Sequence, residues 1–451
     1  AGRRGGAPVA QRPCTSPRDA GVSVLRQARP GRRLLLAAGL LALSATAQAG
    51  AAPTVAQRAL DTWTSAHPNS GVAVWRLDPG RTPVVVAEHR PESPMIPASV
   101  MKVVTSTGAL LGLGPGFRFT TTVSTTRRAT TAGGVLRGPL FLTGAGDPLL
   151  STPAYSRAYL SRLGGNFTRL PAAVRRAGVR RITGPIVVDA TIHDRQRVGR
   201  GWRSYYTAYS PPLSGLTLNQ SHLGDRQGAY AANPERTAGL RLAGELHGLG
   251  VTQRSGVRTG RTPTTAVVLG QVTSPRLSGI LRVMNTNSDN FIAEMIRKNV
   301  GAYAGAGGTS LAGNRATSSL LARHGLISRA DRLVDGSGLS RNNRLTANTL
   351  VGIFSAANAE PRWGRALINS LATGGSGTLI RRFTAAGIRD RVHAKTGYID
   401  GVSGLAGVVD SPRGVRYAFA FLMNDWDIGG AKATQDRIVT LLASGRMDPR
   451  R

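Results

Sequence analysis

The spacing of apolar residues predicts helices and strands in turn along the first part of the chain. A helical pattern starts near residue 55, and two strand-like runs joined by a Pro-Gly turn cover residues 72–86. A further apolar stripe with helical spacing begins just after Pro97 and stops at Gly112. The pattern therefore predicts a helix that begins at Ser99, with this serine at the positive end of the helix dipole.

The C-terminal part of the chain predicts an antiparallel meander. Three strand-like runs cover residues 391–399, 403–409 and 415–423, and an Asp-Gly turn joins the first two. A helical pattern over residues 431–442 follows, and we expect this helix to cover the sheet beside the N-terminal strands.

The middle of the chain has a different residue pattern. Short strand-like pieces separated by Gly, Pro and Thr fill residues 117–272, which we interpret as a β-rich inserted domain. The flanking residues, 50–116 and 273–451, would then form one discontinuous domain. Together these elements predict an α/β (α+β) fold in which helices flank an antiparallel sheet.

A break in a helical pattern places two polar residues between helices. The helical period covers residues 277–284, is lost over 285–290 and returns over 291–300. We therefore expect Ser288 and Asn290 to lie in a short connection between two helices.

Composition adds a large excess of positive charge. The chain has 451 residues, 41% of them hydrophobic, and a formal net charge of +35, so it is long enough for two domains with a real core. Such a charge alone would indicate a nucleic-acid partner. The arginines are scattered singly and in pairs, however, with few aromatic residues nearby to stack on bases, so nucleic-acid binding is disfavoured. A basic surface would also suit a protein that works beside anionic wall polymers.

The first 49 residues have the pattern of an extension followed by a secretory signal peptide. Four arginines between positions 26 and 33 precede an apolar run over 34–43, and Ala47-Gln48-Ala49 has the small-x-small pattern of a cleavage site. The apolar run is too short for a permanent membrane span, and no later run has that length. We expect a secreted, extracytoplasmic, wall-associated protein.

Cysteine and histidine give no sign of a metal or redox centre. The one cysteine, Cys14, precedes the apolar run, so the mature chain would have no disulfide and no thiol nucleophile. None of the seven histidines forms a His-x-x-x-His pair. We expect no metal and no cofactor.

Lysine is scarce, and its placement indicates chemistry. Only four of the 58 basic residues are lysines, and two of them, Lys102 and Lys395, stand in Ser-Val-Met-Lys at 99–102 and Lys-Thr-Gly at 395–397. An arginine does not give up its proton in a protein, whereas a buried lysine can. Ser-Asp-Asn at 288–290 lies between them, and the three motifs in this order are typical of serine enzymes that react with penicillin.

The first motif can supply a nucleophile and its base. A spacing of three positions on a helix brings Ser99 and Lys102 to one face, so their functional groups can meet. A free lysine has a pKa near 10.4, so Lys102 must lose about 3 units, about 4 kcal/mol, to serve as a base at neutral pH. Burial lowers the pKa of a lysine, and so does a second ammonium group nearby, for which Lys395 is the candidate.

The other two motifs can bind and process the substrate. We expect Ser288 to relay a proton between Lys102 and the leaving nitrogen, and the Asn290 amide to bind the peptide.

The third motif would hold the end of the substrate. Lys395 and the Thr396 hydroxyl would bind its terminal carboxylate, and Gly397 would leave room for a substrate strand along the sheet edge. The backbone N–H groups of Ser99 and Tyr398 would form the oxyanion hole.

Each motif is weak alone. A Ser-x-x-Lys pair at a helix start is usually a cap with a solvated lysine, Lys-Thr-Gly is usually an exposed strand edge, and Ser340-Arg341-Asn342 also matches Ser-x-Asn. The conjunction, in the right order and on the expected elements, is specific. Other templates fail, because the sequence has no Gly-x-Ser-x-Gly elbow, no histidine triad signature and no phosphate-binding glycine loop.

With these motifs the chain resembles the D-alanyl-D-alanine carboxypeptidase/endopeptidase family of low-molecular-mass class C penicillin-binding proteins, the DacB-like S13 serine peptidases. The resemblance covers about residues 55–442. The blocks of sequence that carry the resemblance lie at residues 144–148, 184–189, 288–294, 335–341 and 374–379. Ser340 and Ser288 fall in different blocks, which makes Ser288 the serine of the second motif.

The resemblance implies a penicillin-binding transpeptidase/β-lactamase-like fold, with a helical subdomain beside the sheet, that is interrupted between the first two motifs. Ser288 follows Ser99 by 189 positions, a longer step than in the related class A β-lactamases, whose deacylating glutamate we do not find. Between Asn219 and Asn233 the chain passes quickly through a region where longer members carry more β-rich sequence, so we expect a reduced insert.

The implied activity is hydrolysis of D-Ala-D-Ala bonds or of D,D cross-links in peptidoglycan stem peptides, through an acyl-enzyme on Ser99, with β-lactams as acylating inhibitors. The sequence does not choose between carboxypeptidase and endopeptidase action. A second hypothesis is a wall-associated binding or sensing protein that keeps the pocket but turns over little. A deprotonatable Lys102 argues against it.

Overall fold

The computed structural model describes residues 53–126 and 132–449. The predicted signal peptide and Cys14 lie outside the described residues. Within this part of the chain, no helix is long and apolar enough to cross a membrane.

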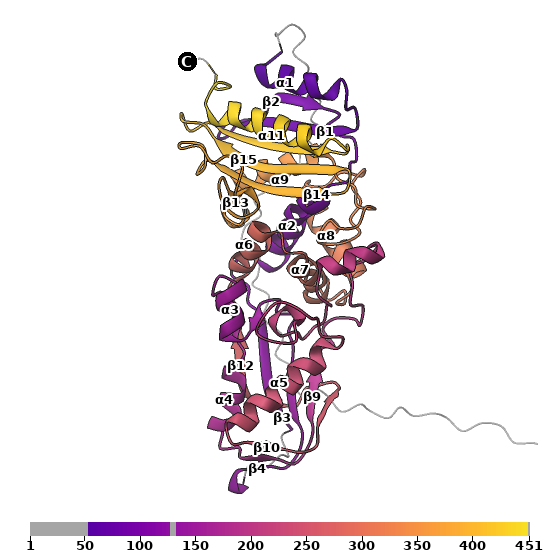
Figure 1. The fold of residues 1–451 in the computed structure, drawn as a ribbon, viewed down its shortest axis with the longest axis vertical. Helices are drawn as coiled ribbons and strands as arrows, with labels where there is room; N and C mark the ends of the chain where they lie inside the picture. Colours follow the sequence, from indigo (N-terminus) through magenta and orange to yellow (C-terminus); the bar gives the residue numbers. More distant parts are fainter. Residues whose placement is uncertain (1–52, 127–131, 450–451) are drawn as a thin grey trace, which may run out of the picture. The chain divides into compact units, whose positions relative to one another are not determined.

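A six-stranded antiparallel sheet joins the N-terminal and C-terminal parts of the chain. Its order is β13-β14-β15-β16-β1-β2, so the N-terminal hairpin extends the C-terminal meander through the pairing of β1 with β16 (Figure 1). The predicted meander and N-terminal strands are confirmed, with boundaries that differ by a few residues. The strands are β1 (Ser70–Leu77), β2 (Val84–His89), β13 (Ala372–Thr373), β14 (Val392–Ile399), β15 (Val402–Asp410) and β16 (Arg416–Met423).

Both faces of this sheet are buried, because successive apolar side chains point into two different cores. On β1, Val72 and Val74 belong to one core, whereas Ala73 and Trp75 belong to the other. The helices α1 (Val55–Thr64) and α11 (Ile428–Ala443) cover the first face, as expected for the last helix (Figure 1).

A layer of helices covers the second face and contains the first two motifs. The central helix α2 is buried from Met101 to Leu110, and it packs against α6, α7, α8 and α10. Because α2 has no solvent-facing side over this stretch, its polar side chains, among them Lys102, are buried as well. The helices of the layer are α2 (Met101–Leu113), α6 (Leu277–Asn287), α7 (Asn290–Tyr303), α8 (Ser310–Arg323), α9 (Ala347–Ala359) and α10 (Gly364–Ile368).

The predicted start of α2 needs a correction. The helix expected to begin at Ser99 begins at Met101, and Ser99 lies in a short 3₁₀ turn, η1 (Ala98–Val100), that leads into it. The left-handed backbone of Ala98 explains the difference, because it forces a tight turn immediately before the serine.

Residues 120–273 form a second sheet with its own apolar core. Its order is β11-β9-β5-β3-β12, with parallel pairs at β11-β9 and β9-β5 and antiparallel pairs elsewhere. Smaller sheets are formed by β10-β8-β4 and β6-β7. The strands are β3 (Thr120–Thr125), β4 (Val135–Leu136), β5 (Leu140–Thr143), β6 (Leu150–Ser151), β7 (Gly165–Asn166), β8 (Arg181–Ile182), β9 (Ile186–Asp189), β10 (Thr252–Gln253), β11 (Val257–Thr259) and β12 (Val267–Thr273).

The inserted segment also contains helices that the strand-like pattern does not predict. They are α3 (Pro153–Tyr159), α4 (Arg169–Arg176) and α5 (Pro234–Gly248). Prolines separate strand-like pieces in the sequence pattern, but here they are the first residues of α3 and α5, a position that proline favours. The separate sheet and core agree with an insertion, and the domain boundaries at residues 117 and 272 stay a prediction.

Candidate active site

Ser99 lies in a tight turn that its surroundings hold in a strained conformation. Ala98 is fully buried with a φ of 46°, a left-handed value that costs a residue with a side chain on the order of 1–3 kcal/mol. Gly338 lies so close that a side chain there would collide with the carbonyl oxygen of Ala98. The turn places the half-buried Ser99 just before the N-terminus of α2.

The Lys102 ammonium group is fully buried and has three hydrogen-bond acceptors. Its Nζ donates to Ser99 Oγ at 2.9 Å, to Asn290 Oδ1 at 2.8 Å and to the Ser337 carbonyl oxygen at 2.8 Å. Burial lowers the pKa of Lys102 to about 8, although nearby carboxylates act in the opposite direction. The structure thus brings the predicted nucleophile and base into contact.

Lys395 is also fully buried but has fewer acceptors. Its Nζ donates to the carbonyl oxygen of Thr396 at 2.8 Å. Its pKa lies well below that of a free lysine, first because of burial and then because of the Lys102 charge. The expected repulsion between the two ammonium groups therefore acts on the pKa of Lys395, whereas the charge of Lys102 is supported by carboxylates.

The second motif lies where two helices meet. Ser288 ends α6 with a left-handed backbone, at a φ of 57°. Asp289 then caps α7 by accepting a hydrogen bond from the backbone N–H of Ile292 at 2.8 Å. Asn290 is therefore the first residue of α7, and only Ser288 and Asp289 form the connection that was expected to contain all three residues.

Asn290 and Ser288 differ in how closely they approach the lysine. The Asn290 Oδ1 accepts from Lys102, and its Nδ2 donates to the carbonyl oxygen of Tyr209 at 3.0 Å. Within the described residues, the Ser288 hydroxyl makes no hydrogen bond to Lys102. Both Ser288 and Asn290 line a cavity of about 320 Å³ together with Tyr209, Gln220 and other residues.

The strand with the third motif has a free edge where a substrate could bind. The short β13 pairs only with His393 and Ala394, so β14 has no described neighbour on that side from Lys395 onward. Thr396 is half-buried and Tyr398 is exposed, whereas Lys395 is fully buried. An edge of this kind can pair with an extended peptide.

Gly397 is required for a reason that the sequence did not indicate. A Cβ at this position would lie 2.8 Å from the carbonyl oxygen of Pro97 and 3.2 Å from the backbone nitrogen of Val100. The expected reason was space for a substrate strand. The glycine also lets β14 approach the turn that contains Ser99, and its role in making space for a substrate stays a prediction.

A buried loop, residues 335–338, positions the third acceptor of Lys102. Glu294 Oε1 accepts from the backbone N–H of Gly336 at 3.0 Å and of Ser337 at 2.8 Å. Asp335 accepts from the backbone N–H of Gly338 at 2.8 Å. Burial, and then the charge of Asp335, raises the pKa of Glu294 to about 7. The loop fixes the Ser337 carbonyl oxygen toward Lys102.

Arg297 supports the same loop from behind. It is fully buried, and its Nη2 donates to Thr105 Oγ1 at 2.7 Å, while the Thr105 hydroxyl donates to the carbonyl oxygen of Gly336. Burial lowers the pKa of Arg297 to about 10, which leaves the guanidinium charged at neutral pH. Glu294 and Arg297 lie three positions apart on α7, so one helix face contacts the loop twice.

The short segment after residue 218 reaches the second motif through a strained turn. Asn219, Gln220 and Ser221 all have positive φ values of 51–63°. Gln220 Nε2 donates to Asp289 Oδ2 at 2.8 Å. The turn therefore contacts the motif directly, and it forms part of the cavity wall.

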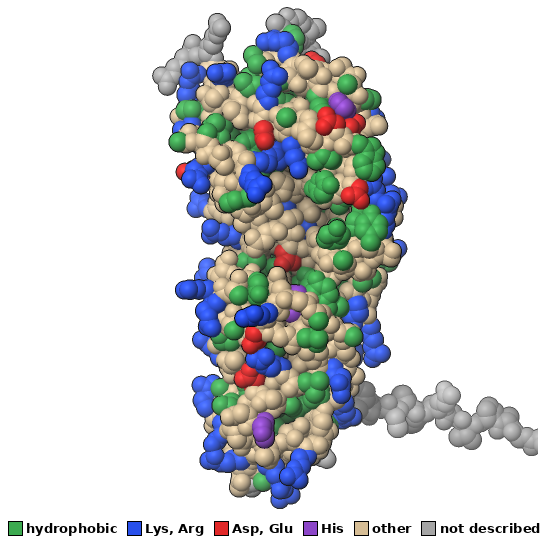
Figure 2. Space-filling model, in the orientation of Figure 1, with side chains coloured by type: hydrophobic (Ala, Val, Ile, Leu, Met, Phe, Trp, Pro, Cys, Tyr) green, Lys and Arg blue, Asp and Glu red, His purple; other side chains and the backbone are tan. Residues whose placement is uncertain are grey.

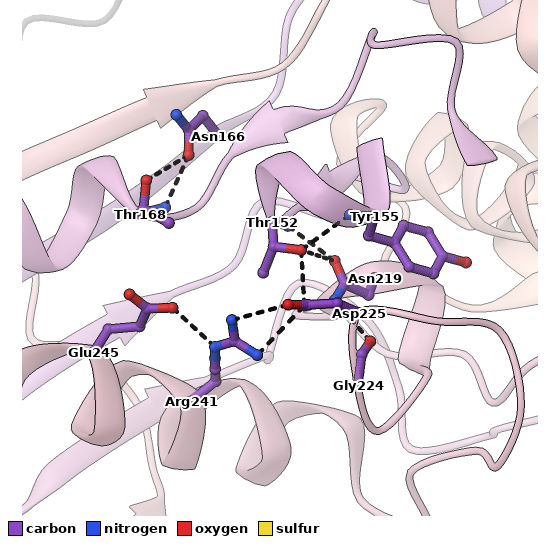
Figure 3. Close-up of polar contacts among 9 residues, drawn as sticks. All are labelled: Thr152, Tyr155, Asn166, Thr168, Asn219, Gly224, Asp225, Arg241 and Glu245. Atoms are coloured by element: carbon purple, nitrogen blue, oxygen red, sulfur yellow. Dashed lines mark hydrogen bonds and ion pairs between the residues drawn. The ribbon is translucent and has the colours of Figure 1, made fainter. Parts of the chain in front are cut away.

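Polar contacts stabilise this turn on the side away from the motif (Figure 3). Asn219 Oδ1 accepts from the backbone N–H of Thr152 at 2.9 Å, and Asn219 Nδ2 donates to Asp225 Oδ1 at 3.1 Å. Asp225 also pairs with Arg241 at 3.4 Å, and Arg241 pairs with Glu245 at 2.9 Å. These contacts offset the backbone strain of the turn.

Sequence reasoning identified the three motifs but gave no role to the residues that support them. Glu294 lies in one of the blocks that carry the family resemblance, and Asp335 and Ser337 lie in another. Residues 291–297 are apolar except for Glu294 and Arg297, three positions apart, and such a pair in an apolar helical segment is the signal that indicates a buried polar contact.

The chain matches the sequence profile of the D-Ala-D-Ala carboxypeptidase 3 (S13) family over residues 54–226 and 220–444. It is 31% identical over 413 residues to carboxypeptidase DacB of Mycolicibacterium smegmatis, with 87% of this chain and 85% of that protein covered. It is 29% identical over 429 residues to a D-alanyl-D-alanine carboxypeptidase of an Actinomadura species, with 77% of each chain covered.

The fold is similar to that of a solved structure. Penicillin-binding protein 4 (DacB) of Haemophilus influenzae superposes with a TM-score of 0.71 at 21% identity, over 86% of this chain and 99% of that one. The same protein in complex with a β-lactam superposes with a TM-score of 0.67 at 21% identity, with the same coverage. The mixed α/β architecture with its antiparallel sheet is thus that of a penicillin-binding protein.

Proposed function

The chain belongs to the S13 family of D-Ala-D-Ala carboxypeptidases, and from this premise we propose that it is a secreted serine D,D-peptidase that cleaves peptidoglycan stem peptides through an acyl-enzyme on Ser99. One observation carries the proposal. The buried Lys102 Nζ lies 2.9 Å from Ser99 Oγ, with a pKa lowered to about 8. A lysine in this state can accept the serine proton.

The first chemical step is acylation of the serine. Neutral Lys102 takes the proton of the Ser99 hydroxyl while Oγ forms a bond to the D-alanine carbonyl carbon. The backbone N–H groups of Ser99 and Tyr398 stabilise the negative charge that develops on the carbonyl oxygen. The carbon–nitrogen bond then breaks, and the leaving amine receives a proton from Lys102 through the Ser288 hydroxyl. Hydrolysis of the ester by water restores Ser99.

The third motif binds the end of the peptide. The substrate lies along the free edge of β14, and its terminal carboxylate meets Lys395 and the Thr396 hydroxyl. Because Lys395 is buried with a lowered pKa, an incoming carboxylate favours its charged form. The Asn290 amide and Gly397 complete the binding site.

Three further points concern the leaving group, the location of the protein and the alternative function. Carboxypeptidase and endopeptidase action differ only in the leaving amine, so one acyl-enzyme serves both reactions. The pattern of residues 26–49 supports export, which would place the protein beside the cell wall. A wall sensor with little turnover is the alternative, and the contact between Ser99 and Lys102 favours the enzyme.

Labelling with a fluorescent penicillin tests the acyl-enzyme. We expect the purified protein to be labelled and a Ser99→Ala variant to remain unlabelled, because Ser99 Oγ is the atom acylated. Equal labelling of both proteins would overturn the proposed nucleophile. Release of D-alanine from a pentapeptide separates the enzyme from the sensor, and muropeptide analysis of digested sacculi separates carboxypeptidase from endopeptidase action.

A further inference from the structure

Exposed aromatic side chains are concentrated beside the catalytic site. Among the described residues, six tyrosine or tryptophan side chains are exposed, and Tyr303 is the one that lies elsewhere, with its hydroxyl bonded to the carbonyl oxygen of Ala145. Tyr230 lines the cavity beside Ser288. We call the remaining four the aromatic rim: Tyr205, Tyr209, Tyr398 and Trp426.

Two members of the aromatic rim lie at the end of the strand that contains the third motif. Tyr398 is next to Gly397 on β14 and is 59% exposed. Trp426 is 80% exposed, the most exposed large apolar side chain of the described residues. Its indole packs over Gly401, in the turn after β14, where a Cβ would lie 3.3 Å from the ring. Packing inside the protein does not explain a tryptophan in this position.

The other two members lie across the site, on η3 (Ser204–Tyr209). Tyr206 is nearly buried in a small core that also contains Ala98 and the end of β14, and it holds η3 beside the serine turn. Tyr205 and Tyr209 are exposed on the same short helix. The backbone carbonyl of Tyr209 accepts from the Asn290 side chain, so this half of the rim is tied to the second motif.

The charge beside Trp426 differs from that of the whole chain. Figure 2 shows basic side chains scattered over the surface, with large hydrophobic side chains grouped in the upper part of the face shown. Trp426 lies between Asp425 and Asp427 in the sequence, and it packs over the turn that begins with Asp400. Cations lie beside these carboxylates: the Lys432 ammonium is 5.4 Å from the centre of the Tyr398 ring, and Arg341 donates to the Asp400 carbonyl oxygen at 2.6 Å. Because charges of both signs lie together at the rim, it favours a neutral occupant with polar and apolar faces over an anionic polymer or an anionic lipid.

The direction of the substrate leads toward Trp426. The terminal carboxylate is assigned to Lys395 and the reacting carbonyl to the N–H of Tyr398, so the preceding part of the stem continues toward Gly401. The strand ends at Ile399, about 7 Å beyond Gly397 at 3.3 Å per residue, and Gly401 lies in the turn that follows. A pentapeptide stem has four residues before the cleaved bond, and these span at most about 14 Å. The sugar to which the stem is attached would therefore reach Trp426.

We propose that the aromatic rim binds the sugar backbone of the wall polymer, a neutral chain of N-acetylhexosamine units, with Trp426 as its main contact. This proposal rests on the proposed function for the direction of the stem. A pyranose ring has a face of C–H groups that packs on an aromatic ring, and hydroxyl groups at its edge that bind polar atoms. Tyrosine and tryptophan offer such a surface at little cost in side-chain entropy.

The first test compares one substrate with and without its sugar. The ratio of kcat/KM for a disaccharide pentapeptide to kcat/KM for the free pentapeptide is measured for wild type, Trp426→Ala, Trp426→Phe and Trp426→Leu. We expect Trp426→Ala and Trp426→Leu to lower this ratio about tenfold, and Trp426→Phe to retain most of it. Leu240→Ala, which removes an exposed apolar side chain of α5, is the matched control and should keep the wild-type ratio. An unchanged ratio in Trp426→Ala, or wild-type behaviour of Trp426→Leu, would overturn the proposal.

The second test does not depend on catalysis. Chitin, a neutral and insoluble N-acetylglucosamine polymer, serves as the glycan; it is sedimented with the Ser99→Ala variant, with and without Trp426→Ala, and vesicles of anionic lipid are sedimented in parallel. We expect the glycan to retain Ser99→Ala and to lose the double variant. Equal retention of both proteins by glycan, or tryptophan-dependent retention by vesicles alone, would contradict sugar binding. Failure of penicillin labelling in wild type would instead refute the acyl-enzyme and leave this measurement intact.

Discussion

The lowered pKa of Lys102 predicts how acylation depends on pH. With a pKa of about 8, roughly one tenth of the lysine is neutral at pH 7 and roughly one hundredth at pH 6. A lysine with the usual value of 10.5 would be neutral in only about 0.03% of molecules at pH 7. Burial therefore raises the population of the base about 300-fold, which corresponds to about 3 kcal/mol.

The acylation rate increases with pH, because only neutral Lys102 can accept the Ser99 proton. The acylation rate should rise about tenfold per pH unit below pH 8 and level off above it. The measurement is the rate of labelling by a fluorescent penicillin between pH 5.5 and 9.5, with circular dichroism at each pH to show that the protein stays folded.

Two lysine variants sharpen this experiment. Lys102→Arg should abolish labelling, because a guanidinium stays protonated. Lys298→Arg is the matched control: Lys298 is also fully buried, but it pairs with Asp194 at 2.6 Å instead of the serine, so its variant should level off at the same pH as wild type. A rate independent of pH between 6 and 8, or labelling of Lys102→Arg at the wild-type rate, would refute Lys102 as the base.

Three further predictions concern the surroundings of the base. Lys395→Arg should keep part of the labelling rate, because arginine can still bind a carboxylate, whereas Lys395→Ala should lose more; equal rates would remove the carboxylate role. Gly338→Ala should lower the free energy of unfolding by at least about 2 kcal/mol in urea titrations, because the new methyl group collides with the Ala98 carbonyl oxygen, and an unchanged midpoint would contradict the close approach. Glu294→Ala should cost about 2–5 kcal/mol in the same titration, since it leaves two buried N–H groups without an acceptor, while Glu294→Gln keeps one acceptor oxygen and should lose less.

Strand-like runs bounded by turn residues were sufficient to predict the C-terminal meander. Residues 403–409 were expected as a strand and lie within β15, because each strand is bounded by turn residues and its side chains divide between two buried faces. The same reasoning failed for α5, whose first residue is Pro234. A proline marks both the break between strands and the start of a helix, and only the stripe of Ala238, Leu242 and Leu246 distinguishes them.

Motif order and spacing were sufficient to place the serine beside its lysine, but not to find what holds them there. The contact of Lys102 with Ser337 depends on a long-range approach, and no local pattern encodes a backbone carbonyl as a partner. The same applies to Gly397, where a Cβ would lie 2.8 Å from the Pro97 carbonyl oxygen. Local propensity cannot give such contacts, because they exist only after distant segments have packed.

The pairing of β1 with β16 also determines when the protein can become active. Ser70 pairs with Met423, and the turn that contains Ser99 packs on β14 and β15, which are synthesised long after it because β14 begins at Val392. A growing chain therefore contains the serine and the first lysine long before the strands that shape their site exist. Contacts so distant in sequence form slowly, because a long loop must close before they stabilise anything. The architecture keeps a hydrolase without function until its C-terminal strands, residues 392–423, have been made.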